Sequence, residues 1–442
     1  MNRRDFTSTL ASATAALALP RAVRAGTPAA APSPLVNGVR LNSHLAALSE
    51  FGRNPQGGVT RLAYSDADRA ARAYVTRLMR EAKLDVSVDA GANILGRRAG
   101  TDAALKPILF GSHIDSVPEG GNYDGDVGSL GAIEVAQTLS DAAIVTKHPL
   151  EVVVFQNEEG GLWGSHAMTA DLTAEELSTP SRSGKTIREG IAFLGGDPDK
   201  LARDRRRRGD YHAYLELHIE QGATLERERI NIGVVEGIVG IRQWEVTVDG
   251  FANHAGTTAM LERHDALLAA ARLIEAVNRI VLGTSGRQVG TVGRIQAFPG
   301  APNVIPGKVV CSLELRDLDA RKIAVLFARI ESEAKKIGEQ NGTTISFKQV
   351  TENVPAPTDP RIRALIVAVS RELELTFRMM PSGAGHDAQD VAQICPVGMI
   401  FVPSAEGISH APKEFSHPKD IENGANVLLH TLLKVDAAPL AP

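Results

Sequence analysis

The sequence predicts an α/β protein in which a mostly parallel-sheet domain carries an inserted ferredoxin-like (βαββαβ) domain. Two apolar runs, at 108–115 and 152–160, are long enough to be fully buried strands, and each ends in acid or imidazole groups. From about residue 237 the strands instead alternate apolar and polar residues, which is typical of half-exposed strands. A chain of 442 residues, 43% of them hydrophobic and 23% charged, has the composition and length of two or three soluble domains.

The N-terminal segment is typical of an export signal. Arg3 and Arg4 open a charged segment and a weakly apolar stretch follows, which together resemble a twin-arginine signal peptide over residues 1–25. We expect cleavage after Ala25, passage through the twin-arginine export machinery to the periplasm, and a short Ala/Pro linker at 26–34. The alternative is a cytosolic protein with a chance arginine pair.

Helical and strand patterns alternate over residues 35–236, which we predict to be the first part of the catalytic domain. Apolar residues recur at helical spacing over 65–83 and 128–139. The segments 93–97 and 215–222 are predicted strands, and the second again ends in polar groups. Strands that alternate with helices imply a largely parallel sheet.

Residues 237–351 are predicted to form the inserted domain, which we call the lid domain. Its predicted elements are strand, helix, two strands, helix and strand, at 241–248, 267–281, 288–297, 309–315, 321–338 and 343–350. This order is that of the ferredoxin-like unit. The helix and strand alternation then resumes, so we assign 352–442 to the second part of a discontinuous catalytic domain.

Charge and cysteine content exclude several classes of protein. The net charge of −4 argues against nucleic-acid binding, and the one basic run, at 203–208, is typical of a solvated helix face or turn. No stretch after the signal peptide is long and apolar enough to span a membrane. Cys311 and Cys395 are expected in different domains, so we expect no disulfide between them.

Acidic and imidazole residues gather where a ligand site is expected. In open α/β sheets ligands bind just past the carboxyl ends of the strands, where the first run delivers His113 and Asp115 and the second delivers Glu158 and Glu159. Taken singly, these residues have simpler explanations, because a His-x-Asp pair is often an N-cap and paired acids often begin a helix. Both clusters at strand ends indicate a hydrolytic metal centre.

A centre with two divalent metal ions, roughly 3.5–4 Å apart, needs a bridging group and further His or carboxylate ligands for each ion. The sequence supplies five candidate ligands: His113, Asp124, Glu159, His218 and His410. Asp115 can orient the imidazole of His113, and Glu158 is free to act as the general base on a bound water. Zn²⁺ is the default ion for this set, and Mn²⁺, Co²⁺ or Ni²⁺ also fit it.

Eight segments of the chain resemble one group of enzymes. These segments are GSHIDSVPEGGNYDGDVG, FQNEEG, LELHIEQG, ANHAGTTAM, GAPNVIPG, LELRDLD, SGAGHDAQD and GISHAPKEF. Together they resemble the amidase branch of the zinc-peptidase family, and within it the hydantoinase/carbamoylase group: N-carbamoyl-L-amino-acid hydrolases, β-ureidopropionases and allantoate amidohydrolases. The resemblance spans nearly the whole mature chain.

The resemblance implies a two-metal amidohydrolase whose lid domain mediates homodimer formation. It implies that His113 and His410 bind one metal ion each and that Asp124 bridges the two ions. Glu159 and His218 would complete the ligand set, and Glu158 matches the base.

The resemblance also implies roles for the lid domain. His254 matches a lid histidine that helps to polarise the scissile carbonyl, and the substrate-binding positions are matched by Gln221, Asn303 and Arg316. Arg316 would pair with the substrate carboxylate, because a planar guanidinium binds a carboxylate through two hydrogen bonds. The simpler alternative is that Arg316 pairs with Asp317 or Asp319 on the surface.

Two segments depart from the pattern of the group. Residues 257–260 read Thr-Thr-Ala-Met where a proline is usual at the third place, and 161–166 lack an arginine that commonly follows the paired glutamates. These differences leave the proposed metal ligands intact and put the exact substrate in doubt. His386 and Asp387, after a glycine-rich turn, could shape the site or compete with His410 as a ligand.

The expected activity is hydrolysis of the carbamoyl (ureido) amide of an N-carbamoyl-L-amino acid or a similar carboxylate-bearing ureide. Allantoate and N-acyl amino acids are the nearest alternative substrates. An alternative of another class is a non-catalytic, metal-dependent periplasmic protein that binds ureides. The presence of Glu158 favours an enzyme, because a binding protein needs no base beside a ligand.

Overall fold

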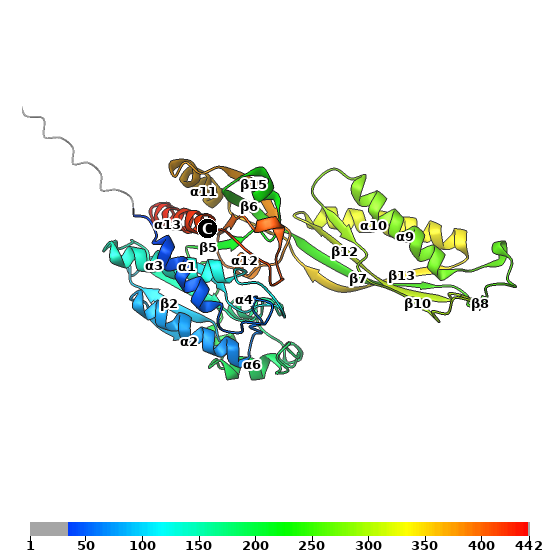
Figure 1. The fold of residues 1–442 in the computed structure, drawn as a ribbon, viewed down its shortest axis with the longest axis horizontal. Helices are drawn as coiled ribbons and strands as arrows, with labels where there is room; N and C mark the ends of the chain where they lie inside the picture. The colour runs from blue at the N-terminus through cyan, green and yellow to red at the C-terminus, as the bar shows by residue number, and fades with distance from the viewer. Residues whose placement is uncertain (1–33, 441–442) are drawn as a thin grey trace, which may run out of the picture. The chain divides into compact units, whose positions relative to one another are not determined.

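The computed structural model describes residues 34–440. The predicted signal peptide at 1–25 and residues 26–33 of the predicted linker lie outside this range. The described residues form a mostly parallel sheet and a second, antiparallel sheet, both packed with helices (Figure 1). The predicted fold class is therefore confirmed. Within 34–440, no helix combines the length and apolar character needed to cross a membrane.

The larger sheet carries the two apolar runs at its centre. Its strands are β1 (Asp85–Val88), β2 (Ile94–Arg98), β3 (Ile108–His113), β4 (Leu150–Phe155), β5 (Ala213–Ile219), β6 (Ile232–Ile238), β14 (Ala356–Pro357), β15 (Phe377–Ser382) and β16 (Val397–Val402). They lie in the order β1-β2-β4-β3-β5-β16-β6-β14, with β15 paired to β6. The neighbours β4, β3, β5 and β16 run parallel and every residue in them is buried, which explains their continuous apolar sequence.

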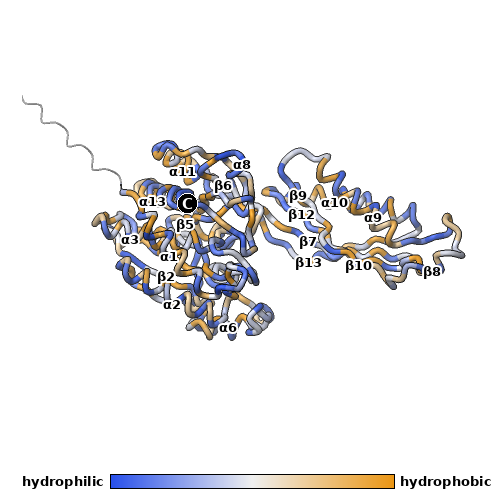
Figure 2. The backbone as a smooth tube through the Cα atoms, viewed as in Figure 1, coloured by the Kyte–Doolittle hydropathy of each residue, from blue (hydrophilic) through white to orange (hydrophobic). Residues whose placement is uncertain are grey.

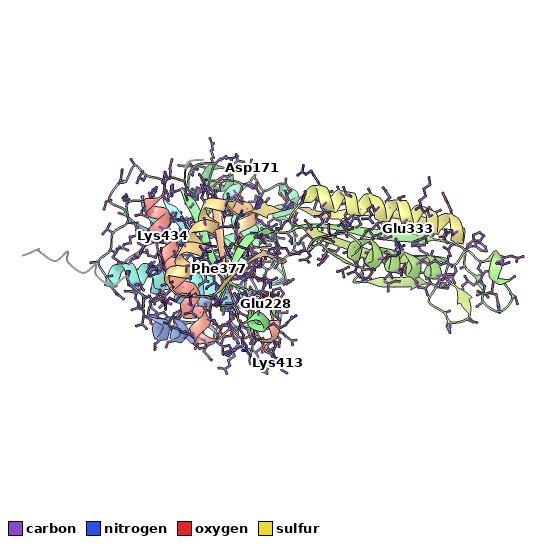
Figure 3. The ribbon with its side chains drawn as sticks, turned by 90° about the horizontal axis from the view of Figure 1, so that it is seen from above. Asp171, Glu228, Glu333, Phe377, Lys413 and Lys434 are labelled. Atoms are coloured by element: carbon purple, nitrogen blue, oxygen red, sulfur yellow. The ribbon has the colours of Figure 1, made fainter. Side chains whose placement is uncertain are left out.

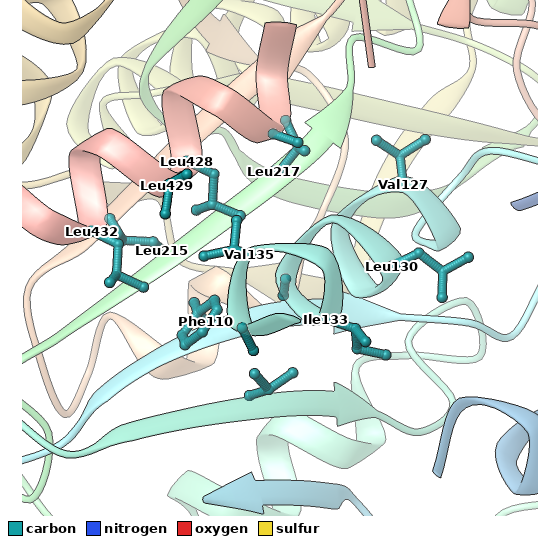
Figure 4. Packing of buried hydrophobic residues seen from close by; sticks show 14 of the residues in the cluster. Phe110, Val127, Leu130, Ile133, Val135, Leu215, Leu217, Leu428, Leu429 and Leu432 are labelled. Atoms are coloured by element: carbon teal, nitrogen blue, oxygen red, sulfur yellow. The ribbon is translucent and has the colours of Figure 1, made fainter. Parts of the chain in front are cut away.

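Helices cover both faces of this sheet. One face packs against α1 (Gly38–Leu48), α2 (Asp66–Glu81), α3 (Asp126–Asp141), α11 (Pro360–Glu372) and α13 (Pro418–Ala437). The other face packs against α4 (Trp163–Thr169) and α12 (Ala388–Val391). Figure 4 shows the first of these cores, in which Phe110, Leu215 and Leu428 meet around α3. The shorter helices are α5 (Ala174–Leu177), α6 (Ile187–Phe193), α7 (Leu201–Asp204), α8 (Thr224–Glu228) and the 3₁₀ turn η2 (Ala405–Gly407).

The lid domain is built on the antiparallel sheet. Its elements are β7 (Gly240–Asp249), β8 (Asn253–His254), η1 (Met260–Glu262), α9 (Ala266–Leu282), β9 (Val289–Thr291), β10 (Ile295–Phe298), β11 (Val304–Ile305), β12 (Lys308–Asp317), α10 (Ala320–Asn341) and β13 (Thr344–Asn353). The main strand order is β10-β12-β7-β13, with β9 also paired to β12 and β8 paired to β11. Figure 2 shows hydrophilic and hydrophobic residues interspersed along α9 and α10, whose apolar faces pack on this sheet.

One predicted strand of the lid domain is wrong in detail. The segment 288–297 is not continuous but forms β9 and β10, which pair with different parts of β12. The hydroxyl of Ser312, in the middle of β12, accepts hydrogen bonds from the backbone N–H groups of Gly293 and Arg294 at 3.2 and 3.1 Å. A side chain therefore replaces part of the backbone ladder where the strand breaks.

Two neighbouring connections join the sheets. Ile238 of β6 pairs with Ala356 of β14, and a few residues further on Ile241 of β7 pairs with Asn353 of β13. Gly240 lies between them, where an added Cβ would come within 2.5 Å of the Pro355 ring. A glycine is needed there because the two segments run so close together.

Candidate metal centre

Four neighbouring parallel strands deliver the predicted ligands to one edge of the larger sheet. His113 ends β3, His218 lies in β5, and Glu158 with Glu159 follows β4 directly. Asp124 lies in the loop between β3 and α3, and His410 lies in the loop after β16. Because β4, β3, β5 and β16 are adjacent, their carboxyl ends meet, as the sequence analysis expected.

The carboxylate of Asp124 lies at the centre of the cluster. Its Oδ1 is 3.2 Å from Nε2 of His218 and 3.6 Å from Nε2 of His113. Its Oδ2 is 3.2 Å from Nε2 of His410, whose same nitrogen is 3.3 Å from Oε1 of Glu159. Potential ligand atoms thus form two groups that share Asp124: His113, Asp124 and His218 on one side, and Asp124, Glu159 and His410 on the other.

The donor atoms of the cluster fit metal ions. Nδ1 of His113 lies 3.1 Å from the carbonyl oxygen of Asp115, and Nδ1 of His218 lies 2.9 Å from that of Ile219. A carbonyl can only accept, so each Nδ1 carries a proton, and each Nε2 is left facing the cluster, where it can bind a cation once its own proton is lost. Both Nε2 atoms and Oε1 of Glu159 are buried without a hydrogen-bond partner. Buried polar atoms rarely lack a partner, and divalent cations would supply one.

The histidines and carboxylates of the cluster stabilise each other's charged forms. Burial by itself raises the pKa of Asp124, but the neighbouring imidazoles of His113, His218 and His410 hold it well below its ordinary value. The close carboxylates of Asp124 and Glu159 raise the pKa of His410 to about 10. The three histidines and the carboxylates therefore form an alternating set of charges, in which cations can replace protons.

Glu158 lies beside the cluster, and its backbone N–H donates a hydrogen bond to Asp115. Its Oε2 is 3.8 Å from Nε2 of His113, and its side chain is 9% exposed. Burial raises the pKa of Glu158 well above its ordinary value, and the nearby Glu159 adds to this rise. A raised pKa suits a group that takes up and returns a proton near neutral pH.

The structure gives Asp115 a role that differs from the expected one. Its backbone carbonyl, rather than its carboxylate, faces His113, since the nearest carboxylate oxygen is 3.8 Å from Nδ1. The carboxylate instead accepts hydrogen bonds from the backbone N–H groups of Glu158 and Glu159, at 3.1 and 3.2 Å. Asp115 thus fixes the turn that carries the two glutamates.

Several residues around the cluster have constrained backbones. Asn157, Gln221 and His410 have φ values of 51°, 56° and 55°, a left-handed conformation that is uncommon for residues other than glycine. Each lies in a loop that borders the cluster. Gly125 has φ 67°, and a Cβ there would come within 2.4 Å of the His113 ring. Such strain is typical of sites where geometry takes priority over stability.

Gln221 and Glu414 support Asp124 from outside the ligand set. The amide of Gln221 donates to Oδ2 of Asp124 at 2.6 Å, so this predicted substrate residue also contacts the cluster. The buried carboxylate of Glu414 accepts from the backbone N–H groups of Tyr123 and Asp124, at 2.9 and 3.0 Å, and from the Ser409 hydroxyl at 2.9 Å. Burial raises the pKa of Glu414 to about 7.

Sequence reasoning assigned no role to Glu414. The residue lies within the quoted segment GISHAPKEF, so the family resemblance gave a signal. Only the tertiary structure reveals its function, because its hydrogen-bond partner Asp124 is separated from it by 290 residues in the chain.

A second buried group lies behind His218. The ring of His386 lies edge-on against that of His218, with centroids 4.5 Å apart, and Glu216, His218 and His386 could together hold an ion. The Ser382 hydroxyl lies 2.8 Å from Nε2 of His386, and the Ser112 hydroxyl donates to Glu216 at 2.8 Å. This group contains neither His410 nor Asp124. His386 therefore lies behind the main cluster and does not take the place of His410 in it.

The lid residues are arranged differently. His254 and Asn303 are exposed neighbours, linked by a 3.0 Å hydrogen bond from the Ala255 N–H to the Asn303 carbonyl. Within residues 34–440 neither has a hydrogen bond or ion pair with the metal cluster. Arg316 donates to Glu314 and to the carbonyl of Gly383, each at 2.7 Å, rather than to Asp317 or Asp319. Arg316 and Gln221 line the same cavity, of about 480 Å³.

Fold and site together define a class of protein: an α/β domain with a His and carboxylate cluster at the carboxyl ends of its parallel strands and an inserted antiparallel domain. Residues 109–434 match the model of Peptidase family M20/M25/M40. The chain is 40% identical over 403 residues to an N-carbamoyl-L-amino acid amidohydrolase of Geobacillus stearothermophilus, covering 90% of this chain and 98% of that protein. It is 38% identical over 408 residues to a ureidoglycolate hydrolase of Arabidopsis thaliana, covering 89% and 86%.

A solved structure supports the same relationship. An amidase of the hydantoinase/carbamoylase family from Burkholderia multivorans aligns with a TM-score of 0.86 at 40% identity, covering 92% of this chain and all of that one. The chain belongs to the M20/M25/M40 peptidase family and is a hydrolase. The family resemblance seen in the sequence is thereby confirmed.

Proposed function

We propose that the protein is a two-metal amidohydrolase that cleaves the ureido amide of N-carbamoyl-L-amino acids or of a similar carboxylate-bearing ureide. One observation carries the proposal: the two oxygens of Asp124 face two different groups of potential ligands, with Glu158 beside them. The named relatives, which act on N-carbamoyl amino acids and ureidoglycolate, support this substrate class.

His113, Asp124 and His218 would hold one metal ion, and Asp124, Glu159 and His410 the other. Two bound cations would polarise the scissile carbonyl and lower the pKa of the attacking water. Zn²⁺ is the default for this donor set, and Mn²⁺, Co²⁺ or Ni²⁺ fit it as well.

Glu158 takes a proton from the attacking water as the new carbon–oxygen bond forms at the ureido carbonyl. It then returns this proton to the amino-acid nitrogen as the carbon–nitrogen bond breaks. The products are the free amino acid and carbamate, and carbamate decomposes to ammonia and carbon dioxide. Asp115 keeps Glu158 in place through the backbone of its turn.

Arg316 and Gln221 are proposed to bind the rest of the substrate. Both line the cavity next to the cluster, and the guanidinium of Arg316 keeps donors available for the substrate carboxylate. His254 and Asn303, on the exposed part of the lid domain, would contact the substrate only after the lid closes or a second subunit contributes them.

The test is ammonia release by purified, metal-loaded protein from a panel of N-carbamoyl-L-amino acids, allantoate, ureidoglycolate and N-acetyl amino acids. We expect turnover of the ureido acids. Faster turnover of allantoate or ureidoglycolate would move the assignment to that ureide, and release of acetate from N-acetyl amino acids would favour an N-acyl-amino-acid amidase. Binding of ureides without any turnover would make the protein a metal-dependent ureide-binding protein.

A homodimer through the lid domain is part of the proposal. Large hydrophobic side chains are exposed on the lid, including Phe251 at 63%, Met260 at 72% and Leu261 at 100%. Large hydrophobic side chains exposed in this way would be covered in a contact with a second subunit. Sedimentation of the wild type and of Leu261→Glu tests this, since a monomeric wild type would contradict it.

The periplasmic location also remains a proposal, based on Arg3 and Arg4. Changing both to lysine should leave active enzyme in the cytoplasm, because the twin-arginine route requires the pair. Unchanged activity in the periplasm would show that the signal has been misread.

A further inference from the structure

The cavity beside the metal cluster is lined by more guanidinium groups than one substrate carboxylate needs. Three arginines line its 480 Å³: Arg287, Arg316 and Arg378. Gln221 lines the same cavity and donates to Asp124 at 2.6 Å, so the cavity adjoins the cluster directly. A substrate whose ureido group lies at the cluster would extend into this cavity.

Each guanidinium group at the cavity has one carboxylate partner. Arg287 is paired with Glu236, Arg316 with Glu314 and Arg378 with Glu228, and none of these glutamates lines the cavity. Among the described residues, Glu220 is the one acid in the lining, and its carboxylate already accepts the backbone N–H groups of Thr224 and Leu225, at 2.9 and 2.8 Å. Guanidinium groups have five donors each, so a single carboxylate partner leaves donors for a ligand.

Arg378 is the arginine best placed to act with the cluster. It lies on β15, and Arg378 and Met380 both line the cavity, as the alternation of side chains along a strand requires. β15 belongs to the same sheet as the strands that carry the cluster, so its position does not depend on the lid domain. Figure 3 marks its ion-pair partner Glu228 and its neighbour Phe377.

The ion pair of Arg378 is easily redirected. The side chains of Arg378 and Glu228 are 39% and 47% exposed. Exposed ion pairs contribute little to stability, so exchanging Glu228 for a ligand carboxylate has a small cost. Arg316, on β12, approaches the cavity from the lid domain, so the two guanidinium groups come from different elements.

We infer that Arg378 binds a second anionic group of the substrate, so that the preferred substrates are N-carbamoyl derivatives of dicarboxylic L-amino acids. This inference rests on the proposed function and makes its substrate class narrower. Arg316 takes the α-carboxylate, and Arg378 takes the side-chain carboxylate. Two separate guanidinium groups distinguish such a substrate from one with a neutral side chain.

The experiment compares each acid with its neutral amide of nearly the same shape. The substrates are N-carbamoyl-L-aspartate against N-carbamoyl-L-asparagine and N-carbamoyl-L-glutamate against N-carbamoyl-L-glutamine. For the wild type we expect kcat/KM to favour one of the acids by roughly 10- to 100-fold, the range of a charged hydrogen bond. In Arg378→Gln the ratio of acid to amide should fall to about one.

Two control variants separate recognition from structure. Glu228→Gln breaks the same ion pair from the other side, yet it should keep or increase the preference for the acid, because Arg378 is then free for the ligand. Arg188→Gln breaks an exposed ion pair between Arg188 and Asp199, and neither of these residues lines the cavity. This variant should leave all rates unchanged. Equal loss of preference in Arg378→Gln and Glu228→Gln would mean that only the ion pair matters and would overturn the inference.

Calorimetric binding of the same four compounds keeps the inference separate from the proposed function. Turnover of ureido acids with no preference for the acids would overturn the inference and leave the function standing. Conversely, tighter binding of an acid that depends on Arg378, without turnover of any compound, would support the subsite and contradict the hydrolytic function.

Discussion

The metal cluster and the outer part of the lid domain contrast in how their residues are held. At the sheet edge, His113 and His218 have side chains only 1% exposed, and each has its Nδ1 fixed by a backbone carbonyl. On the lid, His254 and Asn303 are exposed and their hydrogen bonds are with neighbouring lid residues. One set is assembled and buried by the fold, and the other is exposed on the lid domain.

This difference separates two tasks of the protein. Metal binding requires atoms placed to a fraction of an ångström, which a buried, fully hydrogen-bonded sheet edge provides. The proposed recognition of substrate by the lid residues would require a further event, either closure of the lid or assembly of subunits. Variants at the sheet edge should therefore alter metal content or kcat, whereas lid variants should alter KM.

The largest effect is expected at the paired glutamates. Glu158→Gln should retain metal and lose kcat by roughly 10²–10⁴-fold, because the proton acceptor is removed while the ligands stay. Its neighbour provides a matched control, since Glu159→Gln should lose metal from the group that includes His410. Metal analysis and steady-state kinetics on both variants are needed. Near-normal kcat in Glu158→Gln with full metal content would remove this residue from the mechanism.

The next effect is a loss of metal affinity, expected when the residues that support Asp124 are changed. In Glu414→Gln the amide oxygen can still accept the backbone N–H groups of Tyr123 and Asp124, but the NH₂ group replaces the oxygen that accepts from the Ser409 hydroxyl and the His410 N–H. The loops that carry Asp124 and His410 therefore lose part of their support. Metal affinity should fall roughly 10- to 100-fold, as is usual when a residue behind a ligand is changed. Chelator competition measures this. Unchanged affinity would mean that the loop around Asp124 is fixed by other contacts.

The lid side of the comparison is tested at Arg316. Arg316→Ala should raise KM for carboxylate substrates, because a charged hydrogen bond worth about 1.5–3 kcal/mol is lost. The matched substrate is the same compound with its α-carboxylate replaced by an uncharged amide, and it should be affected much less. If acid and amide lose equally, Arg316 serves mainly to hold Gly383 and Glu314.

The last prediction concerns pH rather than a substitution. In the metal-free protein the pKa of His410 is about 10, so this histidine is protonated at neutral pH and must lose its proton when it binds metal. Metal affinity should therefore rise with pH between 6 and 9, by up to about tenfold per pH unit for each proton released. Calorimetry in buffers of different ionisation enthalpy counts the protons. Affinity independent of pH would show that His410 is not a ligand.

Much of the fold can be predicted from the sequence because its signals are local. The apolar runs ending at His113 and Glu158 indicate buried parallel strands, and their termination in polar groups indicates the edge at which a site forms. Long helices with a periodic apolar pattern, such as α9 and α10, are predicted equally well. The break between β9 and β10 cannot be predicted locally, because it depends on the hydroxyl of Ser312, which lies in a strand that comes later in the chain.

The sequence by itself identified the candidate metal ligands and the candidate base Glu158, because residue type sets donor chemistry. The tertiary structure alone decided that Asp124 lies between the two ligand groups, that Asp115 holds the glutamate turn and that Glu414 supports Asp124. It also placed Arg378 in the same cavity as Arg316. The physical reason is distance along the chain: these contacts join segments that only the packed sheet brings together, and no local pattern encodes them.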